Sequence, residues 1–301
     1  IPLYVGSGSP LSNVGTLTNQ GIELEVGYKL SVDKVNLSFL ANASYVKNEI
    51  KNLGNQTGYI DKESLPTLGT VSRNENGYPI GYFFGYKAIG VFQTQEEIDS
   101  YISPATGKPI QPNAAPGDTK FEDLNGDGVI SDDNEDRTMI GKPNPDWMVG
   151  LTVAADWNGF DLSAFFQGSF GADVFDALRR YELAAVNYTS DALERWTGPG
   201  TSNSMPRIVL GDTPKNFRPS TLLVHDASFL RLRNLQVGYT LPAQLTRKAY
   251  IQRLRFYASF DNLLTITGYK GMDPEIGSTM GIDKGVYPQA RVYTFGLNLT
   301  F

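Results

Sequence analysis

The stretch from Asp146 to Gly171 constrains the fold most, because it reads as two alternating strands joined by a two-residue turn. Along residues 147–157 the large apolar side chains share one face and small or polar ones the other, and residues 160–170 repeat the pattern. Asn158 and Gly159 tolerate the positive φ angles of a type I′ turn, whose twist matches that of its strands. Soluble β-domains and transmembrane barrels both use such hairpins, so the way the pattern recurs must decide between them.

Five further stretches show the same alternation, which gives seven predicted strands in all. They are residues 22–30, 35–45, 235–239, 254–260 and 293–301. Upstream of Leu235, the apolar residues Leu230 and Leu232 have the opposite parity, so we expect a β-bulge near Arg233. A helical turn is predicted at 95–101, and short helices are predicted between 172 and 196, the second of them capped by Asp191.

The connections between these strands alternate in length. Three are short (32–34, 158–159 and 243–252), whereas the other three each exceed twenty residues. Outer-membrane barrels show this asymmetry, with short periplasmic turns and long extracellular loops. The final strand carries an uncharged apolar face, which suits lipid better than water. We therefore predict an all-β fold, an antiparallel transmembrane β-barrel segment spanning 1–301, with extracellular excursions at 50–143 and 172–227.

Composition excludes several other classes. The chain has no cysteine, and no apolar run is long enough for a membrane-spanning helix. The net charge of −6 arises between Gly117 and Arg137, where eight acids face two bases, so a nucleic-acid-binding surface is not expected. The first ten residues lack the regions of a signal peptide, so either one was removed or the chain begins partway through a longer protein.

An EF-hand-type calcium loop is predicted from residue 123 onward. Oxygen donors stand at its first, third, fifth and seventh positions, the last as a main-chain carbonyl, and glycine makes the turn at the sixth; these residues are Asp123, Asn125, Asp127, Val129 and Gly128. The twelfth position should be a carboxylate but is Asn134, with acids on both sides of it. The alternative is an acidic turn without metal, although a divalent cation would offset two of the six uncompensated charges. A metal here would be structural.

No catalytic site can be assembled from the sequence, and we predict that the chain is not an enzyme. His225 is the only histidine, which excludes a Ser-His-Asp triad, and we expect it in a loop. Glu23 and Glu25 share one strand face, where we expect a solvated lumen rather than paired catalytic carboxylates. Arg255 and Tyr257 are expected to face the same lumen.

Two further groups are candidates for contact with cargo. Asp261 shares the lumen face with Arg255 and Tyr257, and the sequence does not rank the three. The aromatic side chains of Tyr82, Phe83, Phe84 and Tyr86 could stack on sugar rings, but packing within a girdle or a loop is the favoured interpretation.

Most of residues 16–301 resemble the C-terminal part of the SusC/RagA-type TonB-linked outer-membrane transporters. The matching text includes NQGIELEVGY, FEDLNGDGVISDDNEDRTMIGKPNPDWMVGL, FLRLRNLQVGYTLP and LRFYASFDNLLTITGYKGMDPEI, in the family's order. The resemblance implies a 22-stranded barrel closed by an N-terminal plug, with these seven strands as its last seven and the plug and TonB box absent here. It also implies that Asp136, directly before Arg137, closes the calcium loop.

The same resemblance implies TonB-dependent import of glycan oligosaccharides or oligopeptides across the outer membrane of a Gram-negative cell. The implied partners are a SusD-like surface lipoprotein, TonB through the missing plug, the N-terminal remainder of the transporter and outer-membrane lipid. Because seven strands cannot close a barrel, we expect the chain to be unstable alone in a bilayer. The alternative is a soluble, secreted, calcium-dependent β-domain for carbohydrate binding or adhesion.

Overall fold

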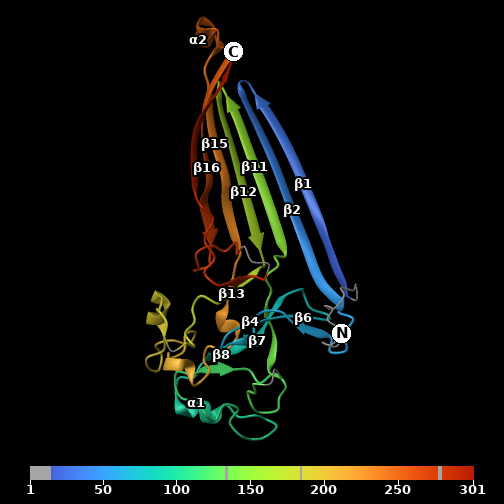
Figure 1. Ribbon diagram of the computed structural model, residues 1–301, viewed down its shortest axis with the longest axis vertical. Coiled ribbons are helices and arrows are strands. Elements are labelled where there is room, and N and C mark those ends of the chain that lie inside the picture. The colour runs from blue at the N-terminus through green and yellow to red at the C-terminus, as the bar shows by residue number, and fades with distance from the viewer. Residues whose placement is uncertain (1–14, 133–134, 184, 277–279) are drawn as a thin grey trace, which may run out of the picture.

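A long antiparallel sheet dominates the computed structural model, which describes residues 15–132, 135–183, 185–276 and 280–301 (Figure 1). The sheet has seven strands in the order β1-β2-β11-β12-β15-β16-β18. This spatial order is also their order along the chain, so neighbouring strands of the sheet follow one another in the sequence. Their bounds are Thr16–Val32, Val35–Asn52, Trp147–Trp157, Phe160–Phe170, Phe229–Thr240, Arg253–Thr267 and Val292–Thr300. The predicted number and order of strands are confirmed.

Two tight turns have the backbone that their residues predict. Asn158 (φ 47°) and Gly159 (φ 90°) connect the paired residues Trp157 and Phe160. Between β1 and β2, Asp33 adopts a φ of 51°. These two strands are longer than the predicted 22–30 and 35–45, because pairing continues through polar residues after the apolar alternation has faded. At the same end of the sheet, α2 (Ala243–Thr246) and η5 (Arg247–Ala249) form the third short connection.

The two faces of the sheet differ in chemistry, and we name them the outer and the inner face. The outer face carries large apolar side chains that no described layer of the molecule covers: Trp157, Phe256 and Leu297 are 55%, 48% and 57% exposed. A soluble sandwich would bury this face between two layers, so the alternative of a secreted β-domain is wrong for this fold. Among the residues described, no helix combines the length and apolar character that a membrane crossing requires.

The predicted β-bulge is confirmed. The register of β15 with β16 shifts between Leu232 and Asn234, and β12 pairs with β15 across the same irregularity. The shift keeps Leu232 and Leu235 on the outer face although they are three residues apart. Arg233 is the extra residue of β15 relative to β12, whereas on the other side two residues of β16 lie opposite it; its guanidinium binds the side chains of Gln167 and Asn262.

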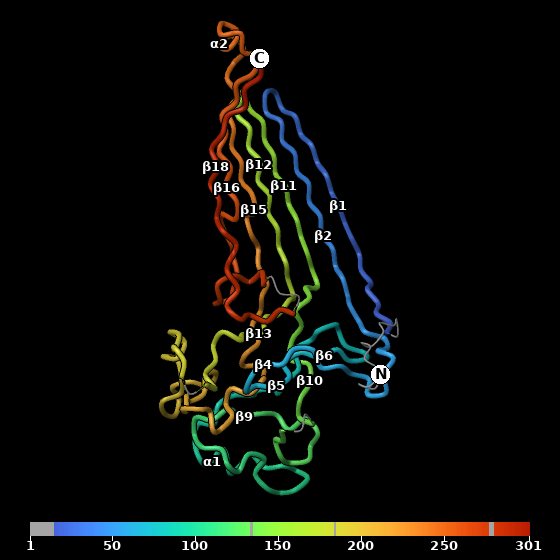
Figure 2. Tube along the Cα trace, in the orientation of Figure 1, coloured from blue at the N-terminus to red at the C-terminus, as the bar shows by residue number. Residues whose placement is uncertain are grey.

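The three long connections fold together at the other end of the sheet (Figure 2). We call the described parts of residues 53–146, 171–228 and 268–291 the loop unit. The first connection contains β3 (Tyr59–Asp61), β4 (Ser64–Leu65), β5 (Gly69–Thr70), β6 (Ser72–Glu75), β7 (Tyr82–Tyr86), β8 (Ala88–Val91), α1 (Gln95–Ser100), β9 (Thr119–Phe121) and β10 (Arg137–Gly141). The second contains β13 (Asp173–Asp176), η2 (Ser190–Glu194), η3 (Leu210–Asp212), η4 (Thr221–Leu223) and β14 (Val224–Asp226), and the third contains β17 (Ile282–Asp283).

The main hydrophobic core lies in the loop unit and draws on all three connections. Its buried members are Leu65, Val71, Phe83, Phe175, Ala177, Leu223 and Ile282. The strands β14, β13 and β17 form one small sheet, in which β13 and β17 are parallel although they come from different connections. Burial of this shared core holds the three connections together.

The helix predictions for the loop unit are only partly correct. The helix at Gln95–Ser100 is confirmed. Residues 173–176 form a strand instead of a helix, and residues 190–194 form a 3₁₀-helix whose N-cap is Thr189. Asp191 therefore does not cap a helix; its carboxylate forms an ion pair with Arg179 instead. Tertiary contact has overridden the local capping signal at this position.

Candidate functional site

The calcium loop predicted from the sequence has a turn structure braced by its own carboxylates. The two oxygens of Asp123 accept hydrogen bonds from the main-chain nitrogens of Gly126 and Gly128, both at 2.8 Å. Asp127 accepts one from the nitrogen of Val129, also at 2.8 Å. Gly126 and Gly128 have φ angles of 77° and 87°, which favour glycine. The side chains of Asp123 and Asp127, which are predicted metal ligands, therefore also hold the backbone of the loop in place.

Asp136, the closing residue implied by the family resemblance, joins the two ends of this loop. Its side chain is fully buried and accepts hydrogen bonds from the nitrogens of Leu124 (3.1 Å) and Ser131 (3.0 Å). The side-chain amide of Asn125 donates a hydrogen bond to the carboxylate of Glu135 at 3.0 Å, a contact that the calcium-loop motif does not predict. The alternative closing position, Asn134, lies outside the described residues.

The oxygen donors of this loop suit a hard cation in kind, since all of them are carboxylate, amide or carbonyl oxygens. In the part of the chain that the structure describes, no group of three or more His, Cys, Asp or Glu side chains is arranged to hold a metal ion. The predicted set contains three such side chains, those of Asp123, Asp127 and Asp136, and they do not form such a group in this structure; Asn125 and the Val129 carbonyl would supply the other oxygens. The calcium site stays a prediction.

The expectation that six negative charges near this loop lack compensation is wrong. Three of the acids form ion pairs with bases from elsewhere in the loop unit: Asp118 with Arg207 at 2.6 Å, Glu122 with Lys87 at 3.4 Å, and Asp132 with Lys215. The charge count along the sequence could not include Arg207 and Lys215, because they belong to the second long connection. Repulsion within the segment is therefore a weaker argument for a metal.

The aromatic run of β7 packs inside the loop unit and is not available to cargo. Tyr82, Phe83, Phe84 and Tyr86 are between 0% and 4% exposed. The guanidinium groups of Arg73 and Arg137 lie 3.6 Å and 4.3 Å from the ring centre of Phe84, one as part of β6 and one directly after the calcium loop. The favoured interpretation of loop packing is confirmed, and stacking on sugar rings is excluded for these four side chains.

The inner face of the sheet carries polar side chains that lie across neighbouring strands. Arg255 donates to Asp161 at 2.9 Å, and this pair crosses Gly238, where a Cβ atom would lie 2.5 Å from both side chains. Tyr257 covers Gly296 in the same way, with its ring 2.5 Å from the position of a Cβ. These contacts explain why glycine stands between long polar side chains on this face.

Other inner-face residues agree with a polar, solvated surface. Asp261 accepts a hydrogen bond from the amide of Asn234 at 2.7 Å, next to the β-bulge. Glu23 and Glu25 are exposed and stand opposite Ser44 and Asn42 of β2. The two glutamates therefore face small polar partners.

The third long connection is bound to the inner face at the β-bulge, and we call its described residues, 268–276 and 280–291, the inner strap. Arg231, which is 2% exposed, forms ion pairs with Asp273 and, at 3.1 Å, with Glu275. Arg233 binds the same Glu275 at 2.6 Å and also donates to Gln167 at 2.6 Å. The β-bulge thus supplies a second arginine, Arg233, that attaches the inner strap to the sheet.

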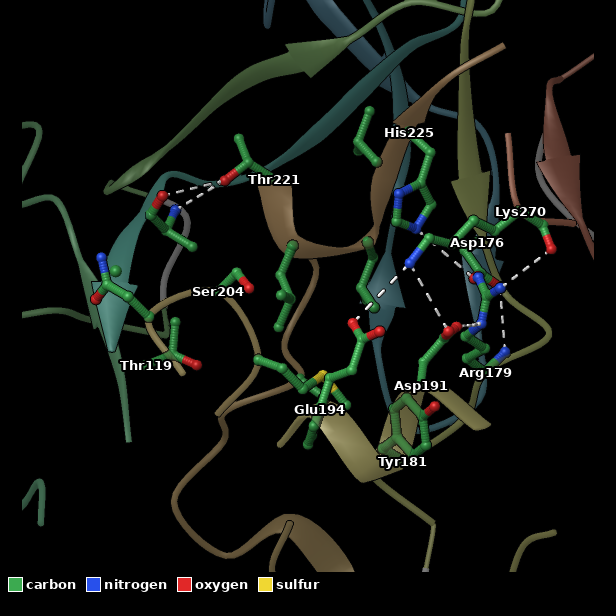
Figure 3. A pocket seen from close by; sticks show the side chains of 18 of the residues that line it. Thr119, Asp176, Arg179, Tyr181, Asp191, Glu194, Ser204, Thr221, His225 and Lys270 are labelled. Atoms are coloured by element: carbon green, nitrogen blue, oxygen red, sulfur yellow. Dashed lines mark hydrogen bonds and ion pairs between the residues drawn. The ribbon is translucent and has the colours of Figure 1, made fainter. Parts of the chain in front are cut away.

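A cavity of about 660 Å³ opens within the loop unit, and we call it the loop cavity (Figure 3). Its charged wall contains Asp176, Arg179, Asp191, Glu194 and Lys270, which come from the second connection and the inner strap. Buried Asp176 pairs with Arg179, and Arg179 Nε lies 2.8 Å from Asp191 Oδ2. Sequence reasoning missed this group, because nothing in the local pattern brings residues 176, 191 and 270 together.

His225 also lines the loop cavity and lies on β14, so its predicted position in a loop is wrong. Its Nε2 is 3.7 Å from Asp176 Oδ2. Burial lowers the pKa of the imidazole, although the charge of Asp176 opposes the shift. A lowered pKa keeps His225 neutral at pH 7, and Figure 3 shows its ring beside Asp176 and Arg179 rather than near a nucleophile.

An uncovered apolar outer face, a polar inner face, short turns at one end and a folded loop unit at the other define a section of the wall of an outer-membrane β-barrel. Comparison with known proteins agrees, although no family model matches the chain. TonB-dependent receptors P3 and P26 of Formosa agariphila are 32% and 31% identical to it over 100% of its length, and the receptor SusC of Bacteroides thetaiotaomicron is 30% identical over 96%. The chain belongs to the SusC/RagA-type TonB-linked outer-membrane transporter family.

Solved structures of this family have the same fold. A structure of the RagAB peptide transporter superposes on the whole chain with a TM-score of 0.75 at 27% identity, and the RagAB peptide importer in its 'open-open' state with a TM-score of 0.74. The chain covers 31% and 30% of those two chains, and it spans about 30% of the length of the curated relatives.

Proposed function

We propose that this chain supplies part of the wall and the extracellular loops of a TonB-dependent importer in the outer membrane of a Gram-negative cell. The observation that carries the proposal is the outer face, whose aromatic and aliphatic side chains stay exposed along the sheet, while the opposite face is mostly polar and includes the exposed large apolar side chains of Leu40, Met148 and Phe165. Such an apolar face carries no free-energy penalty when lipid surrounds it. The loop unit, built from all three long connections, would then lie on the extracellular side.

The cargo proposed is a large nutrient, either a glycan oligosaccharide or an oligopeptide. The RagAB structures, which are of a peptide transporter, support the peptide part of this range, whereas the glycan part follows from the family resemblance alone. The proposed partners are a SusD-like surface lipoprotein, TonB acting on a plug, and the N-terminal remainder of the transporter. Closure of the barrel by further strands would satisfy the free edges of β1 and β18.

A structural calcium ion is the proposed cofactor of the loop unit. Asp123, Asn125, Asp127, the carbonyl of Val129 and Asp136 would hold it, and the ion would neutralise charge and stiffen the loop. The burial of Asp136 and its hydrogen bonds to both ends of the loop support its role in closing the site.

A matched pair of variants of the full-length transporter tests the position of this wall in the membrane. Val153 lies on the outer face and Ala154, its neighbour, on the inner face of β11. Val153→Arg places a charge in lipid and costs about 2–4 kcal/mol near the bilayer midplane, whereas Ala154→Arg places the same charge in water. We expect V153R to abolish assembly into the outer-membrane fraction and A154R to retain it. Equal behaviour of the two variants would contradict the assignment of faces.

Import itself is tested with cells that produce the full-length transporter and its neighbouring lipoprotein. Uptake of labelled oligosaccharide or oligopeptide pools should depend on the transporter and stop when TonB is deleted. Uptake that continues without TonB would exclude active import, and failure of both pools would exclude the proposed cargo classes.

A further inference from the structure

The loop cavity contains a charged group that wall formation and import as described do not use. The ammonium of Lys270 lies 4.0 Å from Asp191 Oδ1 and 3.9 Å from Glu194 Oε2, so it bridges two carboxylates without a short hydrogen bond to either. In Figure 3 the Lys270 side chain reaches between these carboxylates across the cavity. Its side chain is 67% exposed and that of Glu194 is 71% exposed. Ion pairs of this kind contribute little free energy and exchange readily.

One of these carboxylates is fixed in position by buried groups behind it. Arg179, whose side chain is only 13% exposed, holds Asp191 Oδ2 at 2.8 Å and is itself paired with the buried Asp176. Its guanidinium also donates to the main-chain carbonyl of Lys270 at 3.5 Å. The backbone of Lys270 and one oxygen of Asp191 are therefore anchored, whereas the other oxygen and the lysine ammonium remain free to exchange partners.

The charge of the cavity lining favours a cation. Four acids (Asp176, Asp191, Glu194 and Asp226) face two bases (Arg179 and Lys270), which leaves a net charge of −2 with His225 neutral. If the ammonium of Lys270 swings into solvent, the cavity becomes more negative still. A positively charged ligand would replace that ammonium between the same two oxygens.

The rest of the lining sets the shape and polarity of such a ligand. The side chains of Ile89, Met205, Phe217 and Leu222 form an apolar part of the wall next to the charged part. The volume of about 660 Å³ lies within the range of roughly 300–1,000 Å³ that is typical of small-molecule sites. A ligand that fits has one cationic end and a compact apolar body.

We propose that the loop cavity binds a primary ammonium group carried on an apolar body, such as the free N-terminus of a short peptide. Asp191 and Glu194 receive the ammonium, and Lys270 is an internal competitor that occupies the same position when the ligand is absent. The inference rests on the proposed function, because a short peptide is one of the two proposed cargo classes, and binding to the purified protein tests it separately from uptake. An amino sugar offers the same ammonium on a polar body, so the two sources can be separated by experiment.

The test uses the purified full-length protein in detergent and titration calorimetry. The probe is leucyl-leucine amide, which has one ammonium and no carboxylate; its N-acetyl form removes only the charge, and the glucosamine dimer offers ammonium groups on a polar body. We expect the amide to bind at least tenfold more tightly than either comparison ligand. Equal binding of the acetylated form would overturn the proposal, and tighter binding of the glucosamine dimer would overturn the apolar part of it.

Variants of the charged residues Asp191, Glu194 and Lys270 give a sharper result than loss of binding alone. Asp191→Asn and Glu194→Gln should each weaken binding of the amide at least fivefold. Lys270→Met should strengthen it about threefold or more, because the competitor is gone. Lys215→Met, a control at another exposed lysine of the loop unit, should leave the affinity unchanged. If Lys270→Met leaves the affinity unchanged or weakens it, Lys270 does not compete with the ligand and the inference fails.

Discussion

The buried ion pair between Arg231 and Asp273, one of the contacts that attach the inner strap, gives the most stringent prediction. Arg231→Met removes the cation that pairs with Asp273, whose side chain is 8% exposed. Glu275 keeps its second partner, Arg233, but Asp273 keeps only hydrogen bonds from the main-chain nitrogens of Glu275 (2.9 Å) and Gln289 (3.0 Å). Leaving one charge of a buried pair without its partner costs about 3–5 kcal/mol, and these two hydrogen bonds place the expected cost near the lower end.

This cost should appear as easier local opening of the strap in the full-length transporter. A loss of about 3 kcal/mol corresponds to roughly a 150-fold larger open population, so thermolysin should cut within residues 268–291 faster by about that factor. The cuts are located by mass spectrometry. The control Arg255→Met removes an inner-face arginine that does not bind the strap and should leave this rate unchanged.

The double variant separates the ion pair from general packing loss. Arg231→Met with Asp273→Asn leaves no unpaired buried charge, so cleavage should be at least tenfold slower than in the single variant. A single variant whose strap is cut within threefold of the wild-type rate would refute the reasoning. A double variant that is cut as fast as the single one would show that the unpaired charge is not the cause.

Three further predictions concern the loop unit. Gly85→Ala places a Cβ against the carbonyl oxygen of Pro219, so the free energy of unfolding, measured by thermal unfolding, should fall by about 1–3 kcal/mol. The control Gly198→Ala, whose Cβ would have nothing within 4 Å, should change the free energy of unfolding by less than about 0.5 kcal/mol. Calcium at 100 times its dissociation constant should raise the free energy of unfolding of the loop unit by about 2.7 kcal/mol. Asp127→Asn should remove most of this stabilisation. A melting temperature that does not change when calcium is chelated would refute the calcium site. Burial raises the pKa of Asp212 to about 6, so the folded state holds its proton more tightly than the unfolded state. The free energy of unfolding should therefore fall by about 2 kcal/mol as the pH rises from 4 to 6.5, and Asp212→Asn should flatten this part of the stability curve.

The hairpins show how far alternation of side chains can predict a sheet. The bounds of β11 and β12 agree with the predicted 147–157 and 160–170, because both strands alternate along their whole length and Asn158-Gly159 fixes the turn. The β-bulge at Arg233 could also be predicted from the sequence. Apolar residues change from even to odd positions there, and on a strand with one apolar face this change requires an additional residue. The ends of β1 and β2 were missed, because their polar residues pair through backbone groups that carry no side-chain signal.

The candidate sites divide in the same way. The calcium loop is a local motif, so its donors and glycines could be assigned from spacing, and the structure adds the hydrogen bonds that Asp136 makes to the loop's two ends. The loop cavity has no local signal, because Asp191 follows Arg179 by twelve residues and Lys270 belongs to another connection. The prediction of Asp191 as a helix cap was wrong, because the helix begins after Thr189 and Arg179 forms an ion pair with the Asp191 carboxylate.

By itself, the sequence determined which side of each ribbon meets lipid and which meets water, where the tight turns fall, and which family the chain resembles. Those properties follow from the order of neighbouring residues, because a strand alternates its side chains whatever surrounds it. Only the tertiary structure decided that the three long connections share one core, that Arg207 and Lys215 neutralise acids of the first connection, and that Arg231 and Arg233 fasten the inner strap. These contacts join residues tens to more than a hundred positions apart, and packing and charge pairing over such separations leave no pattern along the chain.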